Sequence, residues 1–134
     1  MNILAAANIS ASALDAQKLR LDIVSENIAN AHTTKGVDGQ PYQRKVVSFE
    51  SVLDATSGGQ GVRVSDVSTD DSKGEMVHNP QHPHADSKGM VQMPNVNIAT
   101  EMIDMVTATR AYEANLAVVR NARQMATQAL SIGR

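Results

Sequence analysis

Residues 95–132 read NVNIATEMIDMVTATRAYEANLAVVRNARQMATQALSI, with neither proline nor glycine. One stripe recurs in alternating steps of three and four: Met102, Met105, Thr109, Tyr112, Leu116, Val119, Arg123, Ala126 and Leu130. A mean repeat of 3.5 residues is typical of a helix that packs along a partner helix, as in a coiled coil. We therefore expect a long helical segment at 95–134, capped at its start by Asn95 or Asn97.

A partner for this helix is expected at the N-terminus, over about residues 3–33. Leu14, Leu21 and Ile28 recur there at seven-residue spacing, and Val24 lies on the same stripe. Ser12, followed three residues later by an aspartate, has the form of a capping box, so the helix could also begin at Ser12. Either start leaves an apolar seam that a second helix can cover.

The middle of the chain holds the residues that interrupt helices. All 4 prolines and 7 of the 8 glycines lie between the two helical segments. Short β-prone stretches occur at 42–49, 61–67, 75–77 and 90–93, and Asp38-Gly39 is a turn signal. The predicted fold class is α+β, with long N- and C-terminal helices paired as a coiled-coil-like hairpin and a small, irregular, β-rich middle. The predicted segments are 1–33, 34–94 and 95–134.

Composition excludes several classes of function. The chain has no cysteine, so disulfides, thiolate metal sites and cysteine nucleophiles are excluded. A net charge of −2 does not supply the basic face that nucleic-acid binding needs. The first cation is Lys18, so no basic region precedes the apolar N-terminal residues and no cleaved signal peptide is expected. No apolar run approaches the length of a membrane span, so no direct membrane insertion is expected.

The strongest candidate for chemistry is a group of three histidines, His78, His82 and His84, followed by an aspartate. Imidazoles and a carboxylate can bind zinc, but Pro80 and Pro83 impose an extended or turning backbone and no second cluster completes a site. A metal-dependent hydrolase is therefore the weakest alternative. We expect no catalytic, metal or cofactor site, and the chain is predicted not to be an enzyme.

Polar residues on the helices favour contact surfaces instead. Glu101 and Asp104 share a helix face, which is expected to be solvated or to face a partner. Asn27 and Asn30 lie one helical turn apart. Two interpretations of this pair remain open. It caps a fraying helix end, or it is a packed polar pair that fixes how helices of different subunits register.

Several motifs together resemble one known family. Residues 19–31, LRLDIVSENIANA, resemble the N-terminal signature of bacterial flagellar rod and hook proteins. The motifs Gln40-Pro41-Tyr42, His82-Pro83, Ala85-Asp86, Gly89, MPNVN at 93–97, Glu101-Met102 and RAYEAN at 110–115 resemble the proximal rod proteins within that group. The chain departs from the pattern at His32, commonly asparagine, and at His78 and Met90, where an aromatic residue is common. The three-histidine group is then peculiar to this chain, which weakens the metal hypothesis further.

The resemblance implies a structural subunit of the flagellar basal-body rod, the drive shaft that spans the periplasm. Such subunits are exported unfolded by the flagellar type III export apparatus without a cleaved signal, and they polymerise helically with one another and with other rod proteins. Their paired terminal helices form an inner tube around the export channel, and the middle segment lies outside it.

Subunit contacts are expected at both helical ends. The expected interface residues are Leu14, Leu21, Val24, Asn27, Ile28, Asn30, Met102, Met105, Arg110, Tyr112, Asn115, Leu116 and Val119. The leading alternative is a helical-hairpin adaptor that binds one partner without forming a filament.

Overall fold

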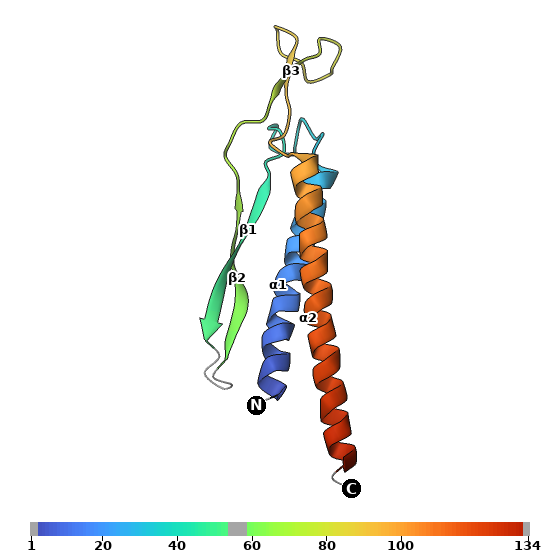
Figure 1. Cartoon of the computed structure of the whole chain (residues 1–134). Helices are drawn as coiled ribbons and strands as arrows, with labels where there is room; N and C mark the ends of the chain where they lie inside the picture. The colour runs from blue at the N-terminus through green and yellow to red at the C-terminus, as the bar shows by residue number, and fades with distance from the viewer. Residues whose placement is uncertain (1–2, 54–58, 133–134) are drawn as a thin grey trace.

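Two long helices run antiparallel along the molecule, so that the beginning of the first and the end of the second lie at the same end (Figure 1). They are α1 (Ile3–Ala29) and α2 (Ile98–Ile132) in a computed structural model that describes residues 3–53 and 59–132. The C-terminal end of α2 extends beyond the start of α1 (Figure 1). The predicted helical hairpin is confirmed.

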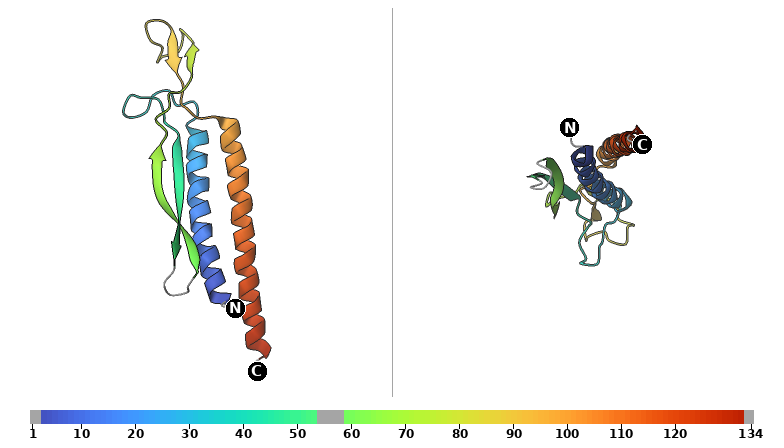
Figure 2. Two further views of the ribbon diagram at one scale, coloured as in Figure 1. Left: turned by 60° about the vertical axis from the view of Figure 1, so that its left-hand side comes forward. Right: turned by 90° about the horizontal axis from the view of Figure 1, so that it is seen from below.

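The middle segment contributes two antiparallel strand pairs. β1 (Lys45–Leu53) pairs with β2 (Gln60–Thr69), with an irregularity between Ser48 and Phe49. This ribbon lies along α1 on the side away from α2, so α1 is the middle of three layers (Figure 2). β3 (Met76–His78) and β4 (Met90–Gln92) form a smaller pair beyond the start of α2. All four predicted strand regions are present, and the α+β fold class is confirmed.

The helix starts distinguish between the capping alternatives. Asn97 caps α2, because its Oδ1 accepts hydrogen bonds from the backbone N–H groups of Ala99 at 3.0 Å and Thr100 at 3.3 Å. The capping-box interpretation of Ser12 is wrong, since α1 already includes residues 3–11. The Ser12 hydroxyl instead donates to the Ile9 carbonyl within α1 and accepts the backbone N–H of Val62, which ties α1 to β2.

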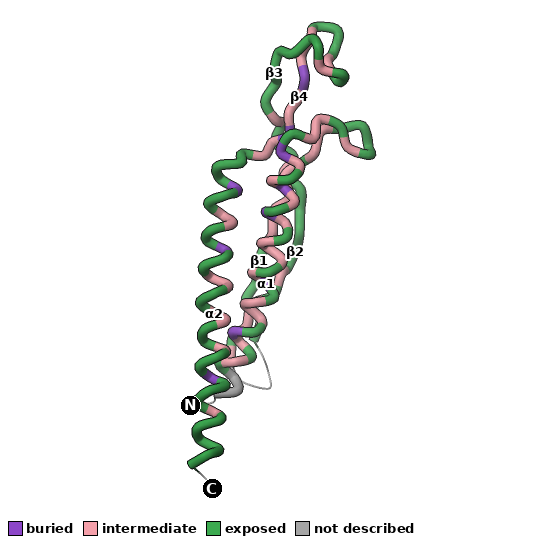
Figure 3. Tube along the Cα trace, turned by 90° about the vertical axis from the view of Figure 1, so that its right-hand side faces the viewer, coloured by how far each residue is buried: buried purple, intermediate pink, exposed green. Residues whose placement is uncertain are grey.

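The core is small and consists of short side chains. Buried apolar residues are Ala16, Val24, Ala31, Val91, Ala108 and Ala122. They lie where the helices face each other and near the β3–β4 pair, while most of the outer surface of α2 is exposed (Figure 3). Alanines at the contact allow two helices to approach closely.

The predicted stripe on α2 is only half correct. Its members at 105, 112, 116, 119 and 126 are half-buried, but Thr109 and Arg123 are exposed, and Met102 and Leu130 are 57% and 77% exposed. The buried positions of α2 are Glu101, Ala108 and Ala122, each one residue before a predicted member. At these three places the contact lies one residue earlier than predicted, because small side chains and one paired carboxylate occupy it in place of larger groups.

Two glycines shape the connections between elements. Gly39 has a φ of 81°, in the left-handed region, which confirms the Asp38-Gly39 turn. At Gly74 the chain leaving β2 crosses the chain entering α2. A Cβ atom there would lie 1.8 Å from the carbonyl oxygen of Met93. The Met93 N–H donates to the Glu75 carbonyl at the same crossing, so only glycine fits this approach.

A candidate assembly surface and its buried polar cluster

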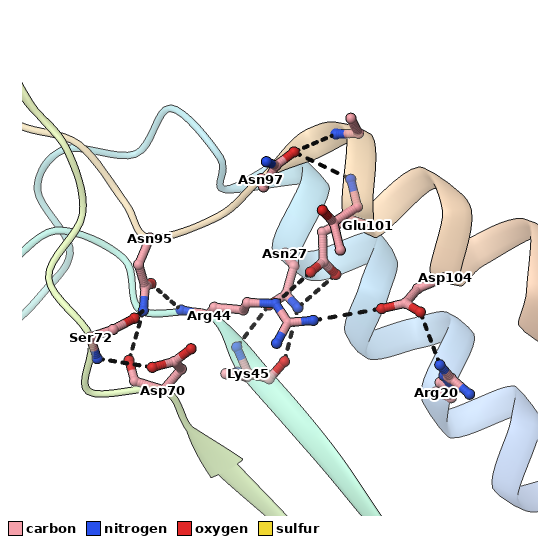
Figure 4. Close-up of polar contacts among 12 residues, drawn as sticks. Arg20, Asn27, Arg44, Lys45, Asp70, Ser72, Asn95, Asn97, Glu101 and Asp104 are labelled. Atoms are coloured by element: carbon pink, nitrogen blue, oxygen red, sulfur yellow. Dashed lines mark hydrogen bonds and ion pairs between the residues drawn. The ribbon is translucent and has the colours of Figure 1, made fainter.

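A group of polar side chains lies where α1, the start of α2 and the chain entering β1 meet (Figure 4). We call Asn27, Tyr42, Arg44, Lys45 and Glu101 the buried polar cluster. Its centre is Asn27, whose side chain is only 1% exposed. Asn27 Nδ2 donates to Glu101 Oε2 at 3.0 Å and to the Lys45 carbonyl at 2.9 Å. Asn27 Oδ1 accepts the Tyr42 hydroxyl and the Lys45 N–H, both at 2.9 Å, so the amide is fully hydrogen-bonded.

Glu101 is the charged centre of the cluster. Its side chain is 0% exposed, although it lies in the first turn of α2. Arg44 Nε donates to Glu101 Oε1 at 2.5 Å, and Asn27 donates to the other oxygen. The expectation of a solvated or partner-facing Glu101 is therefore wrong, because its charge is paired inside the chain.

Asp104 extends the cluster along the helices. Arg20 Nη2 of α1 donates to Asp104 Oδ1 at 3.0 Å, and Arg44 Nη2 lies 3.6 Å from Asp104 Oδ2. These side chains are between 25% and 31% exposed, so solvent screens their attraction more than it screens the pair at Glu101. The two arginines thus link α1, the chain entering β1 and α2 through consecutive turns of α2.

Asn95 links the buried polar cluster to the chain segment that follows β2. The Arg44 N–H donates to Asn95 Oδ1 at 2.7 Å, and Asn95 Nδ2 donates to the Asp70 carbonyl and to Ser72 Oγ. Hydrogen bonding by the backbone and then the side chain of Ser72 lowers the pKa of the exposed Asp70 carboxyl. Asn95 therefore fixes three connections relative to one another rather than capping α2.

Tyr42 must stay protonated to donate its hydrogen bond to Asn27. Burial, followed by the negative charges of Glu26 and Glu101, raises the pKa of Tyr42 from 10.0 to about 12. Between these values the unfolded chain loses the phenol proton while the folded chain keeps it. Stability is therefore full below pH 10 and falls as the pH rises toward 12.

A Tyr42→Phe variant is expected to flatten this alkaline loss. It should also lose about 1 kcal/mol near neutral pH, since Asn27 Oδ1 keeps only one of its two donors. Urea unfolding of both proteins across the alkaline range measures the effect, and contributions of other groups cancel in the difference. Parallel curves for the two proteins would contradict the assignment.

The residues expected at subunit interfaces occupy three kinds of environment. Val24 and Asn27 are buried within the chain, and Met102 and Arg110 are exposed. The others are half-buried: Leu14, Leu21, Ile28, Asn30, Met105, Tyr112, Asn115, Leu116 and Val119. Asn27 and Asn30 have different environments within the chain, and their role between subunits stays a prediction. Asn27 is packed against β1 and α2, whereas Asn30 lies just past α1 and bonds to the Glu26 carbonyl and Thr33.

Several large apolar side chains of α2 are exposed. We call Met102, Ile103, Val106, Val118 and Met125 the α2 surface; they are 57%, 68%, 52%, 45% and 51% exposed. Met102, Ile103 and Val106 lie within two turns of one another at the start of the helix. Grouped exposed apolar side chains of this kind are typical of protein–protein contact surfaces.

Two of the three histidines contact each other, and one of them also contacts the connection after α1. The rings of His82 and His84 lie edge to face with centroids 5.3 Å apart, and His84 Nδ1 lies 2.8 Å from Thr34 Oγ1. Over residues 3–53 and 59–132, no three His, Asp or Glu side chains are placed to hold a metal ion. Over the same residues, no helix combines the length and apolar character needed to cross a membrane.

Both helical ends of the chain match models of known protein families. Residues 5–36 match the model of the flagella basal body rod protein family, and residues 87–132 match the C-terminal region of the flagellar basal body rod FlgEFG proteins. These matches cover α1 and α2, the elements joined by the buried polar cluster. The class defined by the fold and its paired ends is therefore that of flagellar basal-body rod proteins.

Similarity over nearly the whole chain identifies one family within this class. The chain is 43% identical to the flagellar basal-body rod protein FlgC of Bacillus subtilis, over 95% of each chain. It is 47% identical to FlgC of Agrobacterium fabrum, over 96% of this chain and 93% of the relative, and 39% identical to FlgC of Salmonella typhimurium, over 94% of each. The chain belongs to the FlgC family, and it is a structural rod subunit of the flagellar basal body. The adaptor alternative has no support from these matches.

Sequence reasoning missed most of the buried polar cluster. The sequence predicts β-prone chain at Tyr42, Arg44 and Lys45, and it predicts a surface position for Glu101. One signal was available, because Asn27, Tyr42 and Glu101 all belong to motifs shared with rod proteins. Their convergence at one point depends on contacts across 74 positions of sequence, which a local pattern does not report.

Proposed function

We propose that this rod subunit polymerises helically with copies of itself and with other rod proteins, using its paired terminal helices, to form the drive shaft around the export channel. The α2 surface carries this proposal, because its apolar side chains have no cover within the described part of the chain. Head-to-tail contacts that do not close on themselves generate a helical filament. The interface residues on both helices keep the roles expected for them, with Asn27 acting through the helix pair it holds.

The three segments of the chain take different places in this assembly. Segments 1–33 and 95–134 form the inner tube, and segment 34–94 lies outside it. The three-layer arrangement supports this division, since the β1–β2 ribbon lies along the side of α1 away from α2 (Figure 2). The subunit reaches the periplasm unfolded, through the flagellar type III export apparatus. The absence of cysteine from the chain is compatible with that route.

The subunit acts as a structural element, without catalysis and without binding nucleic acid or inserting into a membrane. The buried polar cluster supports this role. Asn27 and Glu101, which could serve chemistry, are 1% and 0% exposed and are fully engaged with partners inside the chain. They hold helices together rather than face a substrate.

Replacing Met102 with aspartate tests the assembly role of the α2 surface. Met102 is 57% exposed, so the folded subunit is expected to tolerate the charge, whereas a contact with a neighbouring subunit would bury it. A strain that carries only the Met102→Asp variant should lose swimming, while the isolated variant keeps its helical circular dichroism. Met102→Leu is the matched control and should swim. Normal swimming of the aspartate variant would contradict the proposed surface.

A further inference from the structure

The buried polar cluster draws its members from three separate parts of the chain. Asn27 lies near the end of α1, Glu101 lies in the first turn of α2, and residues 42–45 lead into β1. We propose that this arrangement makes the pairing of α1 with α2 conditional: the helices pair only after residues 42–45 have docked onto α1. The middle segment then acts as an internal checkpoint on the helical hairpin.

The charge of Glu101 creates the condition. In the folded chain, the two helices and residues 42–45 together remove its carboxylate from water completely. Of the side chains that bond to its carboxylate, the helices supply only the Asn27 amide, and the compensating cation, Arg44, comes from the middle segment. A buried carboxylate without its cation is strongly unfavourable, so the helices alone do not form this contact.

Asn27 imposes the same order from the side of α1. Three of its four hydrogen bonds go to the Tyr42 hydroxyl and to the N–H and carbonyl of Lys45, and one goes to Glu101. Without residues 42–45, Asn27 keeps only its hydrogen bond to Glu101, and a hairpin paired in the same way lacks the other three bonds that stabilise it.

The rest of the seam lacks this selectivity. Its most buried positions are small and apolar, namely Ala16, Val24, Ala108 and Ala122. Contacts of this kind form in several registers, whereas a single buried polar position can select one. A checkpoint of this kind would keep an incompletely folded subunit from offering its helices to a neighbour. That benefit rests on the proposed function, but the folding experiment below does not.

Backbone amide hydrogen exchange of the isolated full chain tests the proposal. In Arg44→Met, the amides of residues 98–112 are expected to exchange roughly a hundredfold faster or more, because Glu101 loses its cation. The amides of Lys45 in β1 and Val62 in β2, which donate to Asn27 and Ser12 of α1, should remain the better protected. Arg63→Met is the matched control, since Arg63 pairs with Glu50 on the exposed ribbon and should leave α2 unchanged.

The double variant Arg44→Met with Glu101→Met keeps the proposal testable if Arg44→Met alone unfolds the whole chain. If the checkpoint is the charge of Glu101, removing that charge restores protection of α2 toward the wild-type level. Failure of the double variant to recover would overturn the proposal, as would unchanged α2 exchange in Arg44→Met or unprotected α2 amides in the wild-type chain. The two proposals are tested independently. Swimming of the Met102→Asp strain reports on assembly, whereas recovery of α2 protection in the double variant reports on folding of the isolated chain.

Discussion

An Asn27→Ala variant is expected to lose about 3–5 kcal/mol of unfolding free energy, a large part of what a domain of this size has. The substitution removes four hydrogen bonds at once and leaves Glu101, Tyr42 and the Lys45 backbone without a shared partner. Urea unfolding followed by circular dichroism would measure the loss. The effect is large because the groups left behind are buried, and water cannot replace the lost partner.

Asn30→Ala provides the matched control, three positions along the same segment. Asn30 Nδ2 donates to the Glu26 carbonyl, and its Oδ1 accepts the Thr33 hydroxyl, both within a local and partly solvated turn. Its loss should cost about 1 kcal/mol. Equal losses in the two variants would show that the Asn27 contacts carry no special weight.

A Gly74→Ala variant is expected to disrupt the crossing above the helices, with a loss of about 3 kcal/mol or more. The added Cβ would lie 1.8 Å from the Met93 carbonyl oxygen and 2.8 Å from the carbonyl carbons of Met93 and Pro94. These are backbone atoms, so no side-chain rotation relieves the overlap. Separation of the two connections would also pull Asn95 away from Asp70, Ser72 and Arg44. Thermal unfolding would measure the effect.

Gly39→Asn is the comparison for Gly74. Gly39 has a positive φ of 81°, but an added Cβ would have no atom within 4 Å. Asparagine tolerates this region of backbone conformation, so the variant should unfold close to the wild type. If Gly74→Ala were equally mild, the crossing would have to be looser than its atomic distances indicate.

The elements of the fold could be predicted because their signals are local. The stretch of residues 95–132, which has neither proline nor glycine, predicts α2, and β-prone residues predict all four strands. The turn at Gly39 needed only its dipeptide. The extent of α1 was ambiguous at Ser12, because a serine three residues before an acid also occurs inside helices. There its hydroxyl bonds to the preceding turn and, here, to Val62 of β2.

The seam of α2 could not be placed by periodicity alone. Positions 101, 108 and 122 are spaced as regularly as 102, 109 and 123, so the choice depended on which side chains are apolar. That criterion favoured Met102, which is 57% exposed, over Glu101, which is fully buried. Burial of Glu101 is explained by Arg44, which supplies its countercharge from 57 positions away, and by Asn27, 74 positions away. The class of protein was predicted correctly through its motifs rather than through this geometry.

The position of the two helices at opposite ends of the chain has a kinetic consequence. The contacts that join them, such as Asn27 with Glu101 and Arg20 with Asp104, span 74 and 84 positions of sequence. Folding slows as the sequence separation of native contacts increases, because a long loop must close before those contacts form. The newly made chain should therefore stay open for longer than a local helical hairpin of similar size. For a subunit proposed to pass through a narrow export channel, this delay keeps the chain unfolded, and therefore competent for export, for longer.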